Sequence, residues 1–126
     1  EVADWEATVA HGLLHRSVEQ WLAADTDKAR FYELISRQTR LWSEDSRGEQ
    51  WYAADALAMA WALQPEGATR LERRPLAIEM AGGRTRGATV VDWNRQTGAA
   101  DNTTLLIGYD QARFESQVQR ALGLDS

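Results

Sequence analysis

The stretch WYAADALAMAWALQP, residues Trp51–Pro65, predicts a helix that is apolar on every side and carries one carboxylate, Asp55, near its beginning. Pro65 and the turn Glu66–Gly67 end this helix. A helix that is apolar all round is usually buried, and a buried carboxylate without a partner is costly. The position of Asp55 therefore calls for a structural or a functional explanation.

Length and composition limit what the rest of the chain can be. With 126 residues, 44% of them apolar, we expect one structural unit, residues 1–126. The net charge of −5 disfavours nucleic-acid binding through a basic face. No apolar run approaches the roughly 18 residues of a membrane span. The absence of cysteine excludes disulfides, thiolate metal sites and a cysteine nucleophile. The compartment stays open, with the cytoplasm as the default.

The residues before the apolar helix predict two further helices. Asp4–Arg16 is expected to be irregular or a short strand, and Ser17–Gln20 matches a capping box that begins a short helix. Asp25–Asp27 begins a second helix, because acids are favoured at the positive end of a helix. Ser43–Gln50 is polar and contains glycine, which predicts a surface loop. The apolar stripe of the second helix consists of Phe31, Leu34, Ile35, Leu41 and Trp42.

After the apolar helix the period changes to two. Strands are expected at Leu76–Met80, Ala88–Trp93 and Thr103–Gly108, followed by a helix that Asp110 caps and Gly123 ends. The predicted fold is therefore α/β, with helices, a three-strand meander and a closing helix. The apolar helix requires more neighbours than this chain supplies, which suggests a missing partner segment.

Three groups of residues are candidates for chemistry. His11 and His15 have the spacing of a helical metal site, but a glycine lies between them and no third ligand is near, so satisfied histidines are favoured. Gly82–Gly87, GGRTRG, could hold an anion, but a hairpin connection with solvated arginines is the better interpretation. For Asp55, the local pattern favours a helix cap, and the alternative is a ligand for a hard cation such as calcium.

Two segments together resemble the inosine-uridine preferring nucleoside hydrolase family. GGRTRGATVVDWNRQTGAADN, Gly82–Asn102, is similar to a Thr-Arg-Gly-x-Thr-Val-Val-Asp motif near the C-terminus of that family. AADALAMAWALQPE, Ala53–Glu66, resembles its acidic helix start, and Trp21–Arg40 suits the preceding helices. The resemblance extends from about residue 18 to 122. It implies the C-terminal portion of an open, mostly parallel sheet flanked by helices.

The resemblance implies a calcium-dependent hydrolase that cleaves the N-glycosidic bond of ribonucleosides in purine or pyrimidine salvage. Asp55 matches the last aspartate ligand of the calcium ion. The other ligands and the general base belong to an N-terminal aspartate cluster that is absent from this chain, so the catalytic residues are not identified here. Glu1 is not an initiator methionine, and we expect a fragment, a processed product or one of two subunits. The expected partners are a ribonucleoside, the N-terminal portion of the same enzyme and further copies in a homo-oligomer.

One departure concerns the leaving base. The family commonly has His or Trp before the metal aspartate, whereas this chain has Ala54, which can neither protonate nor stack on a base. Trp51, Tyr52 and Trp42 are candidates for stacking instead, and Ser43–Gln50 matches a loop that closes over substrate. Because of these gaps, a non-catalytic scaffold or partner-binding module is the alternative function. An independent small domain that binds through its tryptophans is a third.

Overall fold

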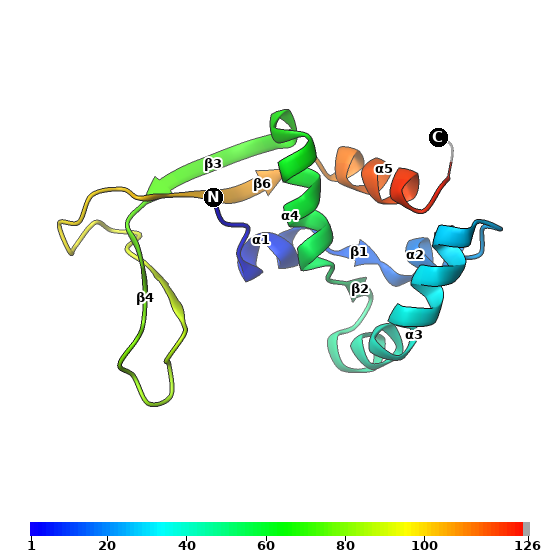
Figure 1. Cartoon of the computed structure of the whole chain (residues 1–126), viewed down its shortest axis with the longest axis horizontal. Helices are drawn as coiled ribbons and strands as arrows, with labels where there is room; N and C mark the ends of the chain where they lie inside the picture. The colour runs from blue at the N-terminus through cyan, green and yellow to red at the C-terminus, as the bar shows by residue number, and fades with distance from the viewer. Residues whose placement is uncertain (125–126) are drawn as a thin grey trace.

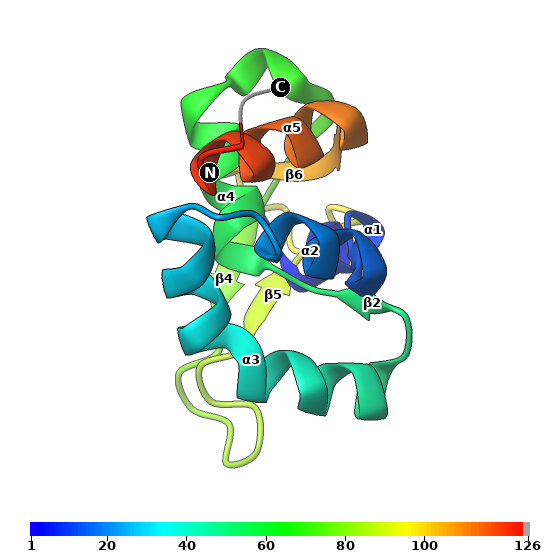
Figure 2. The ribbon, with the colours of Figure 1, turned by 90° about the vertical axis from the view of Figure 1, so that its right-hand side faces the viewer.

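The computed structural model describes residues 1–124, and within them the chain is an α/β structure. The helices form one body, and the β3–β6 and β4–β5 pairs extend from it as an arm (Figures 1 and 2). The elements in chain order are α1 (Trp5–Ala10), β1 (Leu13–Leu14), α2 (His15–Leu22), α3 (Asp27–Arg47), β2 (Gln50–Trp51), α4 (Ala54–Leu63), the 3-10 turn η1 (Pro65–Gly67), β3 (Ala68–Arg74), β4 (Leu76–Ile78), β5 (Thr89–Val91), β6 (Thr103–Tyr109) and α5 (Gln111–Ala121).

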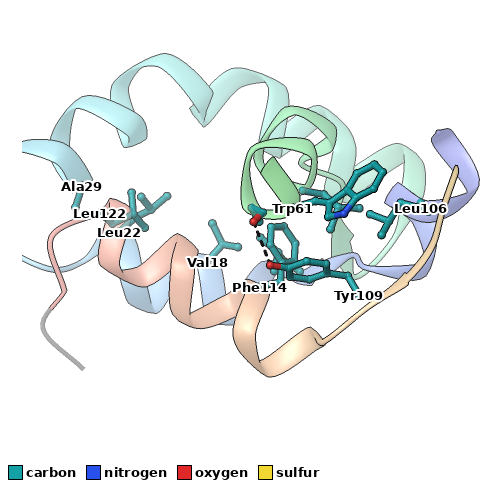
Figure 3. Close-up of a cluster of buried hydrophobic side chains, with 12 residues drawn as sticks. Val18, Leu22, Ala29, Trp61, Leu106, Tyr109, Phe114 and Leu122 are labelled. Carbon is teal, nitrogen blue, oxygen red and sulfur yellow. Dashed lines mark hydrogen bonds between the residues drawn. The ribbon is translucent and has the colours of Figure 1, made fainter. Parts of the chain in front are cut away.

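The core joins α4 to β6 and α5. Trp61 and Phe114 are buried beside Tyr109 (Figure 3), whose hydroxyl lies 3.1 and 3.0 Å from the carbonyl oxygens of Ala60 and Gln64. Burial raises the pKa of the Tyr109 phenol above its ordinary value, because the charged form would lose its hydration. The buried apolar cluster comprises Ala7, Leu13, Val18, Leu22, Ala29, Leu57, Ala60, Trp61, Leu106, Tyr109, Phe114 and Leu122.

A buried arginine connects α2 to α3. Arg40 is 2% exposed, its guanidinium pairs with Glu19 of α2 and with Glu33 of α3, and its Nε donates to the Ser36 hydroxyl at 3.0 Å. Ser36 in turn donates to the Tyr32 carbonyl one turn earlier, at 2.6 Å. Such a bond often bends a helix, and α3 bends near its middle (Figure 2).

This arrangement corrects the predicted apolar stripe of α3. Phe31, Leu34 and Ile35 are 63, 79 and 58% exposed, and the residues turned inward are Ala29, Ser36, Arg40 and Ser43. The polar face of α3 packs on α2 because Arg40 finds its charged partner there. Burial of an ionic group is tolerated where it is paired and hydrogen-bonded.

The sheets also differ from the predicted three-strand meander. Each ladder is an antiparallel pair, β1–β2, β3–β6 and β4–β5, and the parallel contact among residues 1–124 is one bridge between Val2 and Leu105. The β4–β5 hairpin is confirmed, but β6 pairs with β3 rather than with β5. The sequence analysis missed β3, because the run ATRLERR has few apolar residues and shows no alternation of apolar and polar residues. In the structure its burial follows no clear alternation either.

Several predicted boundaries are wrong. Asp4 caps α1 by accepting from the Ala7 amide at 2.9 Å, so Asp4–Arg16 contains a helix as well as the short strand β1. The capping box at Ser17 does not form, because α2 already begins at His15 with no side-chain cap. Thr26 does cap α3, accepting from the Ala29 amide at 3.0 Å, and α3 continues to Arg47. The first part of the predicted loop Ser43–Gln50 is therefore helical.

The apolar helix α4 ends before Pro65 as predicted, but it begins at Ala54 rather than at Trp51, which belongs to β2, and it is buried on one side. Leu57, Ala60 and Trp61 face the core, whereas Met59 and Leu63 are 58 and 70% exposed. The expectation that every side is buried is therefore wrong for residues 1–124. Over the same residues, no helix combines the length and the hydrophobicity that a membrane span requires.

Candidate functional site

Asp55 lies in the first turn of α4, and its side chain is exposed. The N-cap of α4 is Ala53, which offers no side-chain acceptor, and the Asp55 carboxylate makes no hydrogen bond or ion pair within residues 1–124. The capping explanation is therefore wrong in its detail, because Asp55 accepts from no free N–H group. The Asp55 carboxylate still interacts favourably with the partial positive charge at the N-terminus of α4. The structure thus leaves a carboxylate at the positive end of a helix with both oxygens free.

A free carboxylate suits calcium chemically, but one residue cannot form the site. Calcium takes six to eight oxygen ligands, and residues 1–124 contain no group of three or more His, Cys, Asp or Glu side chains that could hold a metal ion. Within residues 1–124, Asp55 therefore does not form a calcium site by itself.

Trp51 faces the interior. Its indole N–H donates to the Tyr32 hydroxyl at 3.2 Å, and its ring lies 6.3 Å from that of His15. Together with Tyr32 and Phe31 it lines a largely apolar cavity of about 450 Å³ between α3, α5 and the start of α4. Trp51 is thus one residue from Tyr52 in the chain but belongs to a different environment, since neighbouring residues of an extended segment point to opposite sides.

Tyr52 and Trp42 belong to a second cluster, which we call the Arg47 cluster: Trp5, Trp42, Arg47 and Tyr52. The ring of Tyr52 meets that of Trp5 edge to face at 5.7 Å. The guanidinium carbon of Arg47 lies over the rings of Trp5 and Trp42, 5.2 and 4.9 Å from their centroids. Sequence analysis missed Trp5 and Arg47, because α1, the end of α3 and the start of α4 meet only in the folded chain.

His11 and the glycine-rich loop serve structure. The Nδ1 of His11 lies 3.0 Å from the Gln111 side-chain oxygen, and its Nε2 accepts from the Tyr109 amide at 2.9 Å. Both ring nitrogens of His11 are therefore engaged, which confirms the prediction for His11, whereas the buried Nε2 of His15 has no hydrogen-bond partner within residues 1–124. Gly82–Gly87 connects β4 to β5 with exposed arginines, which confirms the hairpin connection.

The polar residues of the Gly82–Asn102 segment hold the hairpin arm together. The Asp92 carboxylate accepts from the amides of Gln96 and Thr97, at 2.9 and 2.8 Å, and from the Thr97 hydroxyl at 2.7 Å. These bonds, led by the Thr97 amide, lower the pKa of Asp92. The Asn102 amide bonds both the N–H and the carbonyl of Leu76 at 2.9 Å. The most specific motif of the sequence therefore has a structural role in this arm.

Comparison with known proteins identifies the family. A family model described as inosine-uridine preferring nucleoside hydrolase matches residues 1–116, and the chain belongs to this family. The pyrimidine-specific ribonucleoside hydrolase RihA of Klebsiella pneumoniae is 42% identical over 60 residues, which are 48% of this chain and 19% of that protein. RihA of Escherichia coli is 38% identical over a stretch of the same length.

Solved structures show the same fold. An inosine-guanosine nucleoside hydrolase superposes with a TM-score of 0.79 at 22% identity, covering 97% of this chain and 38% of that one. A purine-preferring ribonucleoside hydrolase from Gardnerella vaginalis gives 0.70 at 23% identity, with 93 and 37% covered. The chain thus spans less than two fifths of these relatives. The expected resemblance is confirmed, and the α/β fold with it.

Proposed function

We propose that this chain is part of a ribonucleoside hydrolase in which Asp55 is a calcium ligand. Membership of the nucleoside hydrolase family supports the reaction class, and the observation that carries the assignment of Asp55 is its free carboxylate at the start of α4. The remaining ligands and the general base come from the N-terminal portion of the enzyme. That portion also contributes most strands of the open, mostly parallel sheet.

The proposed reaction is hydrolysis of the N-glycosidic bond. A water oxygen bonds to C1′ of the ribose while the C1′–N bond breaks, its electron pair leaves with the base, and a proton of the water passes to the general base. A bound calcium ion would anchor the sugar and make the water more acidic. Asp55 contributes one anionic oxygen ligand, and the positive end of α4 favours that carboxylate in its ionised form.

The aromatic residues of the site take different roles in this proposal. Trp42 and Tyr52, within the Arg47 cluster, supply surfaces on which a base stacks. Trp51 lines the cavity behind the start of α4 and supports the site from the interior. We further propose a homo-oligomeric enzyme of purine or pyrimidine salvage.

The test uses the complete polypeptide, with inosine and uridine as substrates and liquid chromatography of the released base. We expect hydrolysis that stops when EGTA removes calcium and resumes when calcium is added back. Hydrolysis that survives EGTA would contradict the calcium assignment.

A non-catalytic scaffold is the second candidate, and Ala54 favours it, because the residue next to Asp55 carries no group that could protonate a leaving base. The same assay separates the two. Binding of calcium and nucleoside without release of base would support the scaffold and refute the hydrolase.

A further inference from the structure

We propose that the β4–β5 hairpin of one copy packs on α3 of a second copy, and that two such contacts form a symmetric dimer. In each contact the apolar face of the hairpin meets Leu34 and Leu41, and the arginines of the hairpin tip meet the acids at the end of α3. This inference rests on the proposed function and deepens it, because that function includes a homo-oligomer but not the surface that forms it.

The β4–β5 hairpin is apolar on both of its faces. Leu76, paired with Val91, lies on one face, and Ala77, paired with Val90, lies on the other. Val90 is 53% exposed. A strand that is apolar on both sides is typical of sheets that are covered on both faces, and two strands alone are marginally stable. The hairpin therefore has the composition of a buried element in an exposed position.

One face of the hairpin carries a cavity that suits an aliphatic side chain. Ala77 and Val90 line this apolar cavity of about 230 Å³ together with Pro75 and Ala99 at the base of the hairpin. The base keeps its shape without a second copy, because the Asn102 side chain bonds the backbone of β4 at 2.9 Å. A surface that is ordered before binding loses less conformational entropy when it binds. The hairpin is thus a preformed docking surface.

α3 offers a complementary side. Leu34 and Leu41 are 79 and 53% exposed, and their spacing of seven residues places them on one side of the helix. Glu44 and Asp45 follow Leu41 by three and four residues and therefore lie beside it. Neither acid forms an ion pair within residues 1–124. Neither leucine lines the cavity near Trp51 or belongs to the Arg47 cluster.

The distribution of charge favours a second copy as the partner. The arm, residues 68–109, contains six arginines and four acidic residues, whereas the rest of the chain contains eight basic and fifteen acidic residues. Arg84 and Arg86 at the hairpin tip are exposed, and in the part of the chain that the structure describes they form no ion pair. A basic arm is therefore attracted to the acidic body of another copy.

The geometry permits both contacts at once. The hairpin tip and α3 lie on the same side of the molecule, the lower side in Figures 1 and 2, so one two-fold axis can bring each hairpin to the α3 of the other copy. Four residues of extended chain, about 13 Å, separate Val90 from Arg86. Ten residues of helix, about 15 Å, separate Leu34 from Glu44. With Leu34 at the hairpin cavity, the arginines of the tip therefore reach the acids of α3.

The experiment measures self-association of the complete protein by sedimentation velocity. Arg84→Glu combined with Arg86→Glu should raise the dissociation constant of the dimer by about tenfold or more, because like charges then meet at both contacts. Glu44→Arg combined with Asp45→Arg should weaken the dimer in the same way, and all four substitutions in one chain should restore it. Arg120→Glu is the matched control, because Arg120 is an exposed arginine of α5, outside both surfaces; it should associate as the wild type does.

Three results would overturn the proposal: a monomeric wild type, an unchanged dissociation constant in either double variant, or no restoration by the four substitutions together. Variants that keep the wild-type mass but lose Tm in calorimetric unfolding would also overturn it, because the N-terminal portion of the same polypeptide would then cover the hairpin. Release of base from inosine and uridine is measured on the same samples. A wild type that dimerises as expected but hydrolyses neither nucleoside would refute the proposed function and support the interface.

Discussion

Replacement of Asp55 tests the proposed site most directly, because we expect a small effect on stability and a large effect on activity. The Asp55 carboxylate is exposed and makes no hydrogen bond within residues 1–124. Its loss removes only the interaction with the end of α4, about 0.5 kcal/mol. We therefore expect Asp55→Asn and Asp55→Ala to shift the Tm of the calcium-free complete protein by about 2 °C or less.

Activity should fall far more. Loss of a residue that only supports a metal ligand typically costs 10–100-fold in affinity or activity, so removal of a direct anionic ligand should cost at least about 100-fold. Asp55→Asn keeps a neutral oxygen and should lose less than Asp55→Ala. The assays are kcat/KM on inosine and uridine, calcium titration by calorimetry, and calorimetric unfolding without calcium.

A matched control makes the result interpretable. Asp25 is an aspartate whose side chain is 96% exposed and pairs with Arg30 on the surface. Exposed pairs of this kind contribute little, so Asp25→Asn should behave as the wild type in all three assays. Wild-type kinetics and calcium affinity in Asp55→Ala would refute the assignment of Asp55. A large loss of Tm would show instead that the carboxylate is structural.

Two further predictions concern the scaffold of the site. Tyr109→Phe removes a buried hydroxyl that lies within hydrogen-bond distance of the Ala60 and Gln64 carbonyls, and should destabilise the complete protein by about 1–2 kcal/mol in calorimetric unfolding; an unchanged Tm would contradict this. For Asp92 the folded-state pKa is depressed, so the stabilisation is complete above the ordinary value of 3.8 and is lost as pH falls through the lowered value. The amide resonances of Gln96 and Thr97, which donate to the Asp92 carboxylate, should accordingly titrate with a midpoint below pH 3.8, whereas a midpoint at or above pH 3.8 would refute the depressed pKa.

Short-range patterns identified much of the chain. The apolar run of α4, the Thr26 cap of α3, the Asp110 cap of α5 and the β4–β5 hairpin are local features, because their side chains bond or pack within a few residues. The motif around Asp92 likewise indicated the family. Asp55 could be singled out from sequence because a charge stands out at the start of an apolar helix.

Long-range contacts decided the rest. The polar face of α3 turns inward because Glu19, 21 residues earlier in the chain, meets Arg40. The charged strand β3 forms because β6 lies beside it, a pairing between residues 29 or more positions apart.

For the site, the sequence by itself determined the family, the apolar character of α4 and the acid at its start. Only the tertiary structure decided that this acid is free rather than a cap, that Trp51 turns to the interior, and that Trp5 meets Tyr52 while Arg47 lies over Trp5 and Trp42. The physical reason is that contacts between α1, α3 and α4 depend on packing across the whole chain, whereas periodicity and caps report only neighbours in sequence.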